Sequence, residues 1–298
     1  MKKIAYIAVV ALAVVACNKE EGAKTLTVTP AEKTVFTDED LPELSVSATP
    51  ENALDGVTVE WTSSDPELVT VSPKGELALT VEDIEEKEKV VTITAKAGEL
   101  SATCKLTIKG QIARYEVLDF TKDLGFKMLD RNVGAKSTED IGYFYQWGKI
   151  LPVASGNDTK VNEFYDKDWS PESKGFADWT VAENTPCPKG WSIPTKEQIL
   201  KLKYIVGEVL TYEDYPDFYE GTEEEYQNYK KILNQLHLLN SGKFTAAEKD
   251  DKYKGEAFWS STLTEKDGNN LPSIYWNGNA PTFETNTYAT AVPVRCVK

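Results

Sequence analysis

The sequence predicts two domains of different fold class, an antiparallel β-sandwich followed by an α+β domain. Over residues 25–109, short runs alternate apolar with polar residues, which is typical of strands with one buried face. Residues 114–298 instead mix aromatic runs with two segments of helical periodicity. The chain has 298 residues, of which 41% are hydrophobic, so each domain has enough apolar side chains for its own core.

The N-terminal segment predicts export. Lys2 and Lys3 precede an apolar run that ends in Val14-Val15-Ala16-Cys17, and this run is shorter than the roughly 20 residues that span a bilayer. The segment resembles the signal peptide and lipobox of bacterial lipoproteins, with a signal over residues 1–17 and a polar tether over 18–24. The resemblance implies that the Cys17 thiol carries diacylglycerol and that the new amino terminus receives a further acyl chain such as palmitate.

The tether begins with Asn18-Lys19-Glu20-Glu21, which resembles the signal that sends Bacteroidetes-type lipoproteins to the outer surface. We therefore expect an outer-membrane protein that faces the cell exterior and meets the membrane by its lipid anchor only. A tether that is merely solvated remains the alternative.

The charged residues exclude some classes of function. The formal net charge is −15 and both domains are acidic, so neither offers the basic face that binding to nucleic acid requires. The only histidine is His237, so a zinc site or a Ser-His-Asp or Cys-His catalytic arrangement is not expected. Paired carboxylates could serve glycoside hydrolysis, but nothing in the sequence singles out two of them. We expect no enzyme, no cofactor and no metal.

The first domain contains strand patterns that are separated by Pro, Gly, Asn and Asp turns. The alternating residues fall in the runs 26–28, 44–48, 57–61, 69–71, 91–95 and 100–108. Val59-Glu60-Trp61-Thr62-Ser63-Ser64-Asp65-Pro66 and Val91–Gly98 are similar to the bacterial Ig-like group 2 family, which implies an all-β Ig-like sandwich that serves as a spacer. Cys104 falls on the inward-facing set of the last strand.

Two helices are expected in the second domain. Thr195 and Gln198 form a capping box before a helical apolar face, and a second amphipathic pattern runs from Tyr226 to Leu239 with His237 inside the helix. Glu223-Glu224-Glu225 suits the positive end of that helix dipole, which is a structural interpretation.

The segments around these helices carry a more specific resemblance. The motifs are Gly142–Lys149, Cys187-Pro188-Lys189-Gly190-Trp191-Ser192-Ile193-Pro194-Thr195, Phe258–Thr262 and Val292–Lys298. In this order they resemble the Fibrobacter succinogenes major paralogous domain family over about residues 117–298. Met128 and Arg131 depart from the family pattern, which puts the local packing there in doubt. The resemblance implies a C-type-lectin-like fold, with two helices beside a mostly antiparallel sheet and the two ends of the domain close together.

With Cys17 lipidated, three cysteines remain, so one pair and one leftover thiol is the simplest count. Cys187 and Cys296 lie in the motifs that define the second domain. The resemblance therefore implies a disulfide between them, which would remove roughly 4–5 kcal/mol of unfolded-state entropy.

A ligand site is expected on the segment that follows Phe258–Thr262. Tyr275, Trp276, Asn277 and Asn279 lie in a stretch that forms an exposed ligand-binding loop in lectin-like folds, and aromatic rings beside amides suit sugar recognition. Trp276 in a strand core is the alternative. The calcium-lectin motif is not present. Further aromatic clusters are either small cores or contact surfaces, and their members are Trp169, Trp179, Tyr212, Tyr215, Phe218 and Tyr219.

These observations predict a surface lipoprotein whose Ig-like spacer presents a lectin-like domain to a glycan or protein ligand. The alternative is a structural or assembly component of the cell surface. The sequence does not name the ligand or the oligomeric state.

Replacing Cys17 by Ser tests the anchor. We expect the protein to leave the membrane fraction, because the thioether to diacylglycerol can no longer form. Cell fractionation measures this, and unchanged membrane retention would contradict the prediction.

Overall fold

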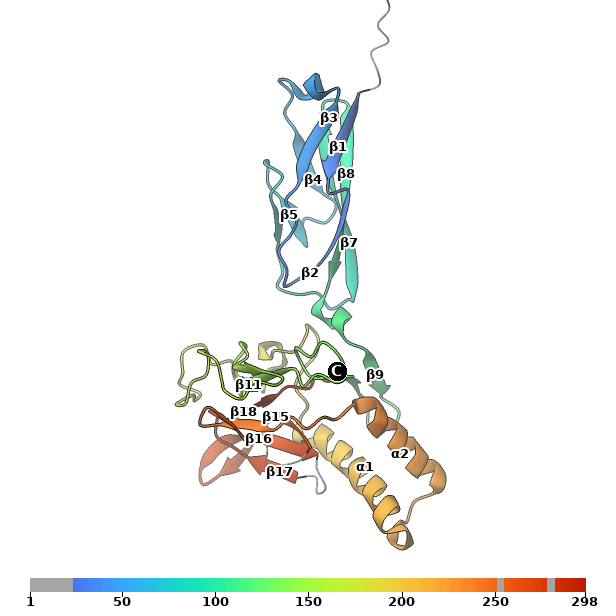
Figure 1. Ribbon diagram of the computed structural model, residues 1–298, viewed down its shortest axis with the longest axis vertical. Helices are drawn as coiled ribbons and strands as arrows, with labels where there is room; N and C mark the ends of the chain where they lie inside the picture. The colour runs from blue at the N-terminus through green and yellow to red at the C-terminus, as the bar shows by residue number, and fades with distance from the viewer. Residues whose placement is uncertain (1–23, 251–254, 278–281) are drawn as a thin grey trace, which may run out of the picture. The chain divides into compact units, whose positions relative to one another are not determined.

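The computed structural model describes residues 24–250, 255–277 and 282–298 of the chain (Figure 1). The described part divides into two compact units. One contains residues 24–33, 41–80 and 91–106, and the other contains residues 34–40, 81–90 and 107–298. No helix within these ranges is long and apolar enough to cross a membrane. Cys17 and the rest of the signal segment lie outside the described residues.

The strands up to residue 109 form a sheet of order β2-β8-β7-β4 and the strand pairs β1-β3 and β5-β6. Their bounds are β1 (Thr25–Thr29), β2 (Glu32–Phe36), β3 (Ser45–Thr49), β4 (Glu60–Ser63), β5 (Val69–Val71), β6 (Leu77–Leu79), β7 (Glu88–Ala97) and β8 (Leu100–Lys109). Val91, Ile93 and Ala95 on β7 and Cys104 on β8 are fully buried, as the period-two pattern predicts.

The prediction of a strand from residue 57 is wrong. Val57 is 38% exposed, and β4 begins only at Glu60. The chain enters β4 from the 3-10 helix η1 (Glu51–Leu54) through a turn at Gly56, whose φ of 71° lies in the left-handed region. The turn delays the start of the strand beyond the first apolar residue.

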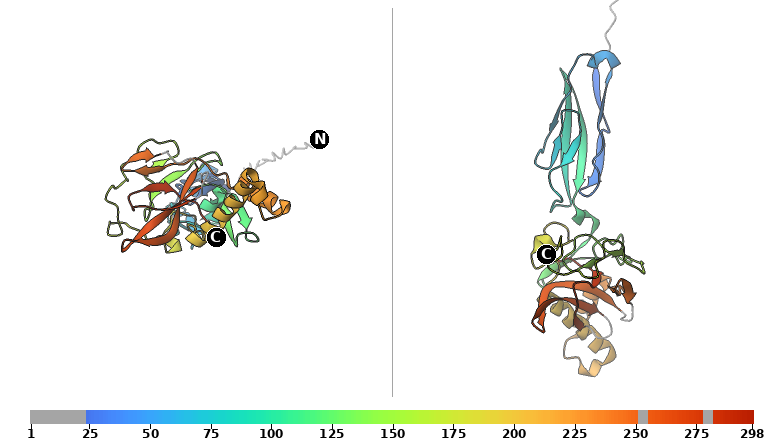
Figure 2. Two further views of the ribbon diagram at one scale, coloured as in Figure 1. Left: turned by 90° about the horizontal axis from the view of Figure 1, so that it is seen from below. Right: turned by 90° about the vertical axis from the view of Figure 1, so that its left-hand side faces the viewer.

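The remaining elements lie in the second unit. Its helices are α1 (Lys196–Asp214) and α2 (Glu223–Leu236). Its strands are β9 (Val117–Phe120), β10 (Phe126–Leu129), β11 (Tyr143–Gln146), β12 (Ala154–Ser155), β13 (Lys243–Thr245), β14 (Glu248–Asp250), β15 (Glu256–Lys266), β16 (Asn269–Asn277), β17 (Thr282–Thr285) and β18 (Ala291–Pro293). They form the pair β9-β10 and sheets of order β12-β11-β18-β13-β14 and β15-β16-β17. Figure 2 shows the ribbon from two further sides.

The β15-β16-β17 sheet is covered on both faces. Trp259 and Ile274 point into a tryptophan-rich core. Its other tryptophans are Trp147, Trp169, Trp179 and Trp191. Their sequence neighbours Phe258 and Tyr275 point into a second core with the apolar faces of α1 and α2. Because successive side chains of a strand alternate between faces, Ala257–Trp259 in β15 and Ile274–Tyr275 in β16 are apolar at consecutive positions.

The two helices lie side by side in the second unit. The predicted capping box of Thr195 and Gln198 is present at the start of α1, and Thr222 and Glu225 form another at the start of α2. The prediction that α2 contains His237 is wrong. His237 is the exposed C-cap in the left-handed conformation with a φ of 46°, so the helix ends at Leu236.

A buried ion pair joins several of these elements. Arg295 Nη2 lies 3.2 Å from both carboxylate oxygens of Glu256 on β15, and both side chains are buried. Arg295 Nε donates to Asn132 Oδ1 at 3.0 Å, and Nη1 donates to the carbonyl of Leu236, the last residue of α2, at 2.7 Å. One guanidinium therefore satisfies a strand carboxylate, a loop amide and a helix end.

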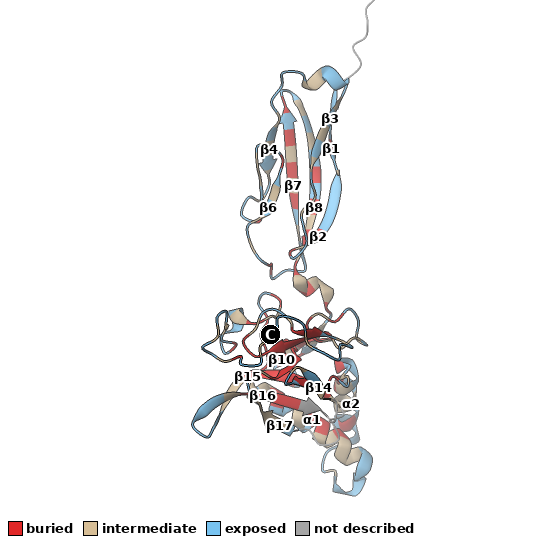
Figure 3. Cartoon of the chain, turned by 60° about the vertical axis from the view of Figure 1, so that its left-hand side comes forward, coloured by how far each residue is buried: buried red, intermediate tan, exposed pale blue. Residues whose placement is uncertain are grey.

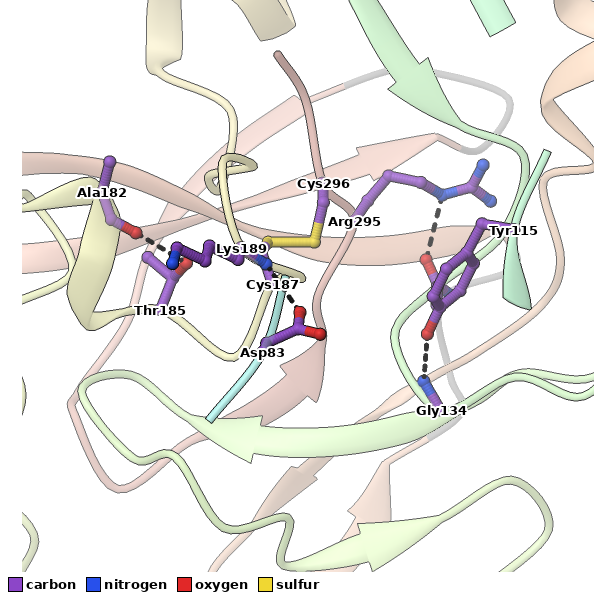
Figure 4. The surroundings of a disulfide bond; sticks show 10 residues. Asp83, Tyr115, Gly134, Ala182, Thr185, Cys187, Lys189, Arg295 and Cys296 are labelled. Atoms are coloured by element: carbon purple, nitrogen blue, oxygen red, sulfur yellow. Dashed lines mark hydrogen bonds between the residues drawn. A yellow bond between two sulfur atoms is a disulfide. The ribbon is translucent and has the colours of Figure 1, made fainter. Parts of the chain in front are cut away.

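The expected disulfide between Cys187 and Cys296 is present and links positions 109 residues apart (Figure 4). Cys296 directly follows Arg295, and Figure 4 shows the two side chains leaving the chain on different sides. Cys104 is a free, buried cysteine, as its place in the strand pattern predicts.

Replacing Arg295 by Met is expected to lower the free energy of unfolding by about 3–5 kcal/mol, because it leaves the Glu256 carboxylate buried without a cation. Lys127→Met is the control. It removes a pair with Asp119 in which both side chains are about half exposed, so we expect a loss under about 1 kcal/mol. Urea unfolding measures both, and equal losses would contradict the role of the buried pair.

Candidate binding surface

Tyr275 does not belong to an exposed site of the kind that the sequence predicts around Trp276. Tyr275 is only 1% exposed and packs against Phe258 and Phe283, so its ring belongs to the core. The expectation rested on the idea that a buried aromatic residue alternates with polar ones, which fails for a strand covered on both faces. The expected loop is also partly strand, because β16 extends to Asn277.

Of the other three residues of that expected site, the structure describes only the backbone of Trp276 and Asn277. The backbone of Trp276 pairs with Ala257 and Thr282 in the sheet. The side chains of Trp276 and Asn277, and all of Asn279, lie outside the described residues.

The aromatic clusters noted in the sequence divide into two kinds. Trp169 and Trp179 are buried, and the Trp147 ring lies 5.5 Å from that of Trp179. They are core residues. The second cluster lies where α1 turns into α2, and we call residues 212–226 the hairpin tip.

Local sequence explains why the chain turns there. Tyr215 is the C-cap of α1, and Pro216 opens the short 3-10 helix η4 (Pro216–Phe218), where the missing proline N–H costs no helical hydrogen bond. Gly221 leaves room for the Tyr219 ring, which a Cβ there would meet, and the Thr222 capping box then starts α2. Figure 3 shows most of this connection as exposed.

Three tyrosine rings form the base of the hairpin tip. Tyr212 on α1 stacks on Tyr226 of α2, with ring centroids 3.8 Å apart and an angle of 15° between the planes. The rings of Tyr219 and Tyr212 meet edge to face, with centroids 5.2 Å apart. Tyr226 is buried, whereas Tyr212 and Tyr219 are half-buried. These contacts hold the two helices together at the turn.

Two further rings of the hairpin tip point into solvent. Phe218 is 77% exposed and Tyr215 is 64% exposed. Single exposed apolar residues are common on proteins, but these two lie three residues apart beside the half-buried Tyr212 and Tyr219. The rings of Tyr215 and Phe218 do not pack in the core, and their exposure suits a contact surface.

The polar groups of the hairpin tip perturb one another. The hydroxyl of Tyr212 donates to the Glu223 carboxylate, which raises the pKa of Tyr212 and lowers that of Glu223. Lys230 Nζ lies 2.7 Å from Glu213 Oε1, and this bond lowers the pKa of Glu213 and raises that of Lys230. Glu213 and Glu223 are therefore ionised at neutral pH.

The hairpin tip also has a one-sided charge. It contains no Lys, Arg, His, Asn or Gln, and its acids are Glu213, Asp214, Asp217, Glu220, Glu223, Glu224 and Glu225. Among the described residues, no group of three or more His, Cys, Asp or Glu side chains could hold a metal ion. The surface is aromatic and anionic, which suits non-covalent binding.

Comparison with known proteins concerns the first part of the chain. Residues 23–106 match the model of the bacterial Ig-like domain (group 2). This segment is a bacterial Ig-like domain. Such domains are typically non-catalytic, and the match ends before the second domain.

A solved structure of a GH10 xylanase from termite gut that contains a bacterial Ig-like domain is 24% identical over 26% of this chain. The likeness spans only 18% of that chain, and its TM-score of 0.20 is too low to support any structural argument. Comparison with curated proteins gives no match.

Replacing Phe218 by Ala is expected to change the free energy of unfolding by no more than about 0.5 kcal/mol, because the ring is mostly in solvent. Tyr226→Ala removes a buried ring from the base of the same tip and should cost about 3 kcal/mol. Thermal unfolding of both variants measures the difference. A large loss for Phe218→Ala would mean that its ring is structural.

Proposed function

We propose that this chain is a cell-surface lipoprotein in which the Ig-like domain is a spacer and the second domain binds a glycan or protein ligand. The observation that carries the binding role is the exposure of Phe218 and Tyr215 at the hairpin tip. The aromatic residues that the second domain needs for stability lie in its cores, whereas these two lie outside them. Clustered exposed aromatic residues are typical of interaction sites.

The second domain is further proposed to belong to the Fibrobacter succinogenes major paralogous domain family, with a C-type-lectin-like fold. Two helices beside antiparallel sheets and the disulfide from Cys187 to Cys296 support this. So does the joining of the ends of the domain. Lys127 N donates to the carbonyl of Lys298 at 2.8 Å, and Lys298 N donates to that of Lys127 at 2.9 Å.

Attachment to the outer membrane rests on the sequence alone. Val14-Val15-Ala16-Cys17 and Lys19-Glu20-Glu21 support a lipid anchor that faces the exterior. An Ig-like domain between the anchor and the second domain suits a spacer, because it adds folded length without a catalytic role.

Binding is tested with the full chain carrying Cys17→Ser, which removes the lipid and leaves both domains intact. The protein is applied to a glycan array and to an array of extracellular proteins, beside the variant Tyr215→Ala/Phe218→Ala. We expect a ligand whose binding falls at least about tenfold in the double variant, since truncating a hot-spot aromatic residue costs 2 kcal/mol or more. Phe164→Ala is the matched control, because Phe164 is a 46% exposed ring elsewhere in the second domain.

Two results would contradict this proposal. The protein could bind nothing on either array. Alternatively, sedimentation could show self-assembly that the double variant abolishes, which would make the chain an assembly component of the surface.

A further inference from the structure

The acids of the hairpin tip have different partners. Glu213 pairs with Lys230, Glu223 accepts from Tyr212 and Gln227, and Glu225 caps α2 through Thr222. Within the described residues, no ion pair or side-chain hydrogen bond involves the remaining acids, Asp214, Asp217, Glu220 and Glu224. All four are exposed.

Helix stability accounts for Glu224, which lies in the first turn of α2, but not for Asp214 at the end of α1. Asp214 is the last residue of α1, and no basic residue lies in the last turn. A carboxylate at that end meets the negative end of the helix dipole, which is unfavourable. Phe218 and Tyr215 also expose apolar surface at the same place. Features that lower stability together at one surface indicate selection for function.

Lys230, which lies just outside the hairpin tip, is bound by a tyrosine and a glutamate of the tip. Lys230 Nζ lies 5.3 Å from the centre of the Tyr226 ring, 2.8 Å from the Tyr226 hydroxyl and 2.7 Å from Glu213. A tyrosine hydroxyl and a carboxylate of the hairpin tip thus hold one ammonium group together. On the outer side, Tyr215 and Phe218 alternate with Asp214 and Asp217 along the chain, and no cation of the tip itself accompanies them.

We propose that the hairpin tip docks a cationic polypeptide segment, one that presents Lys or Arg beside apolar side chains. This inference rests on the proposed binding function and names the class of partner. A guanidinium or ammonium group lies over the exposed rings and pairs with Asp214, Asp217 or Glu220, while an apolar neighbour covers Phe218. Arg suits such a site because its planar head stacks on rings and pairs with carboxylates.

The composition of the tip favours a polypeptide over other ligands. Sugar hydroxyls can donate hydrogen bonds to these carboxylates, but a neutral glycan carries no charge that compensates them, and the hairpin tip has no Asn or Gln side chain to donate to sugar oxygens. Acidic glycans, nucleic acid and anionic lipid surfaces are repelled by its charge. A cationic segment gains from both the rings and the acids.

The test uses the full chain with Cys17→Ser and a fluorescent peptide that carries arginine and leucine in a glycine–serine background. A second peptide has glutamine in place of each arginine. The tip variant Asp214→Asn/Asp217→Asn/Glu220→Gln is compared with Glu163→Gln/Glu172→Gln/Glu265→Gln. The second set removes the same charge from exposed acids elsewhere in the domain. Equal net charge makes non-specific attraction equal in the two variants.

Fluorescence anisotropy is expected to show binding of the arginine peptide that weakens at least about tenfold in the tip variant and less than about twofold in the charge-matched control. Phe218→Ala should also weaken binding, whereas Phe164→Ala should not. Affinity should fall as salt rises, and less steeply in the tip variant. Circular dichroism confirms that each variant is folded.

Three results would overturn the inference. The two charge variants could lose affinity equally, the glutamine peptide could bind as well as the arginine peptide, or Phe218→Ala could bind normally. Binding of a glycan through the tip on the array would also overturn it but would leave the proposed function standing. A chain that binds on neither the arrays nor the peptide assay would refute both.

Discussion

The burial of Arg295 is the constraint on which the second domain depends. A guanidinium taken out of water is stable only if its donors and its charge are satisfied, and here Glu256, Asn132 and the end of α2 satisfy them. Those partners come from a strand, a loop and a helix that are distant in sequence. Each must therefore reach its place before the charge is compensated, which couples the position of α2 to that of β15 and of the terminal segment.

That coupling explains how the aromatic residues are distributed. With α2 held at its C-terminal end, the apolar faces of both helices cover one side of the β15-β16-β17 sheet, and the tryptophan-rich core covers the other. At the far end of the helical hairpin, the rings of Tyr212, Tyr219 and Tyr226 pack on one another. Phe218 and Tyr215 have no place in that small packing, so they remain exposed.

Local patterns could be predicted well from the sequence. The alternation that buries Val91, Ile93 and Ala95, the capping box at Thr195 and the pairing of Cys187 with Cys296 all agree with the structure. The first two depend on neighbours in sequence, and the disulfide partners were implied by the resemblance of their two motifs to a known domain family. Tyr275 was misplaced because burial on both faces of a strand is a tertiary property that no local pattern contains. His237 was placed inside a helix because periodic apolar residues continue beyond the residue at which the backbone turns left-handed.

The sequence predicts the members of the candidate surface but not which of them are exposed. Tyr212, Tyr215, Phe218 and Tyr219 stood out as a cluster, but core and contact surface could not be separated without knowing which rings had packing partners. One signal in the sequence pointed to exposure. Seven acids without a single base between residues 212 and 226 are too costly to bury, so the rings among them had to lie near solvent.

The place of Arg295, Cys296 and Val297 in the sequence has a consequence for biosynthesis. These three consecutive residues supply the buried cation, one half of the disulfide and a backbone bridge to both Met128 and Ser192. A nascent chain that has not yet reached residue 297 lacks one or more of the three, so the core of the second domain stays incomplete until that residue is synthesised. Until this short segment is synthesised, the preceding strands lack their final packing partners and are accessible to chaperones and proteases.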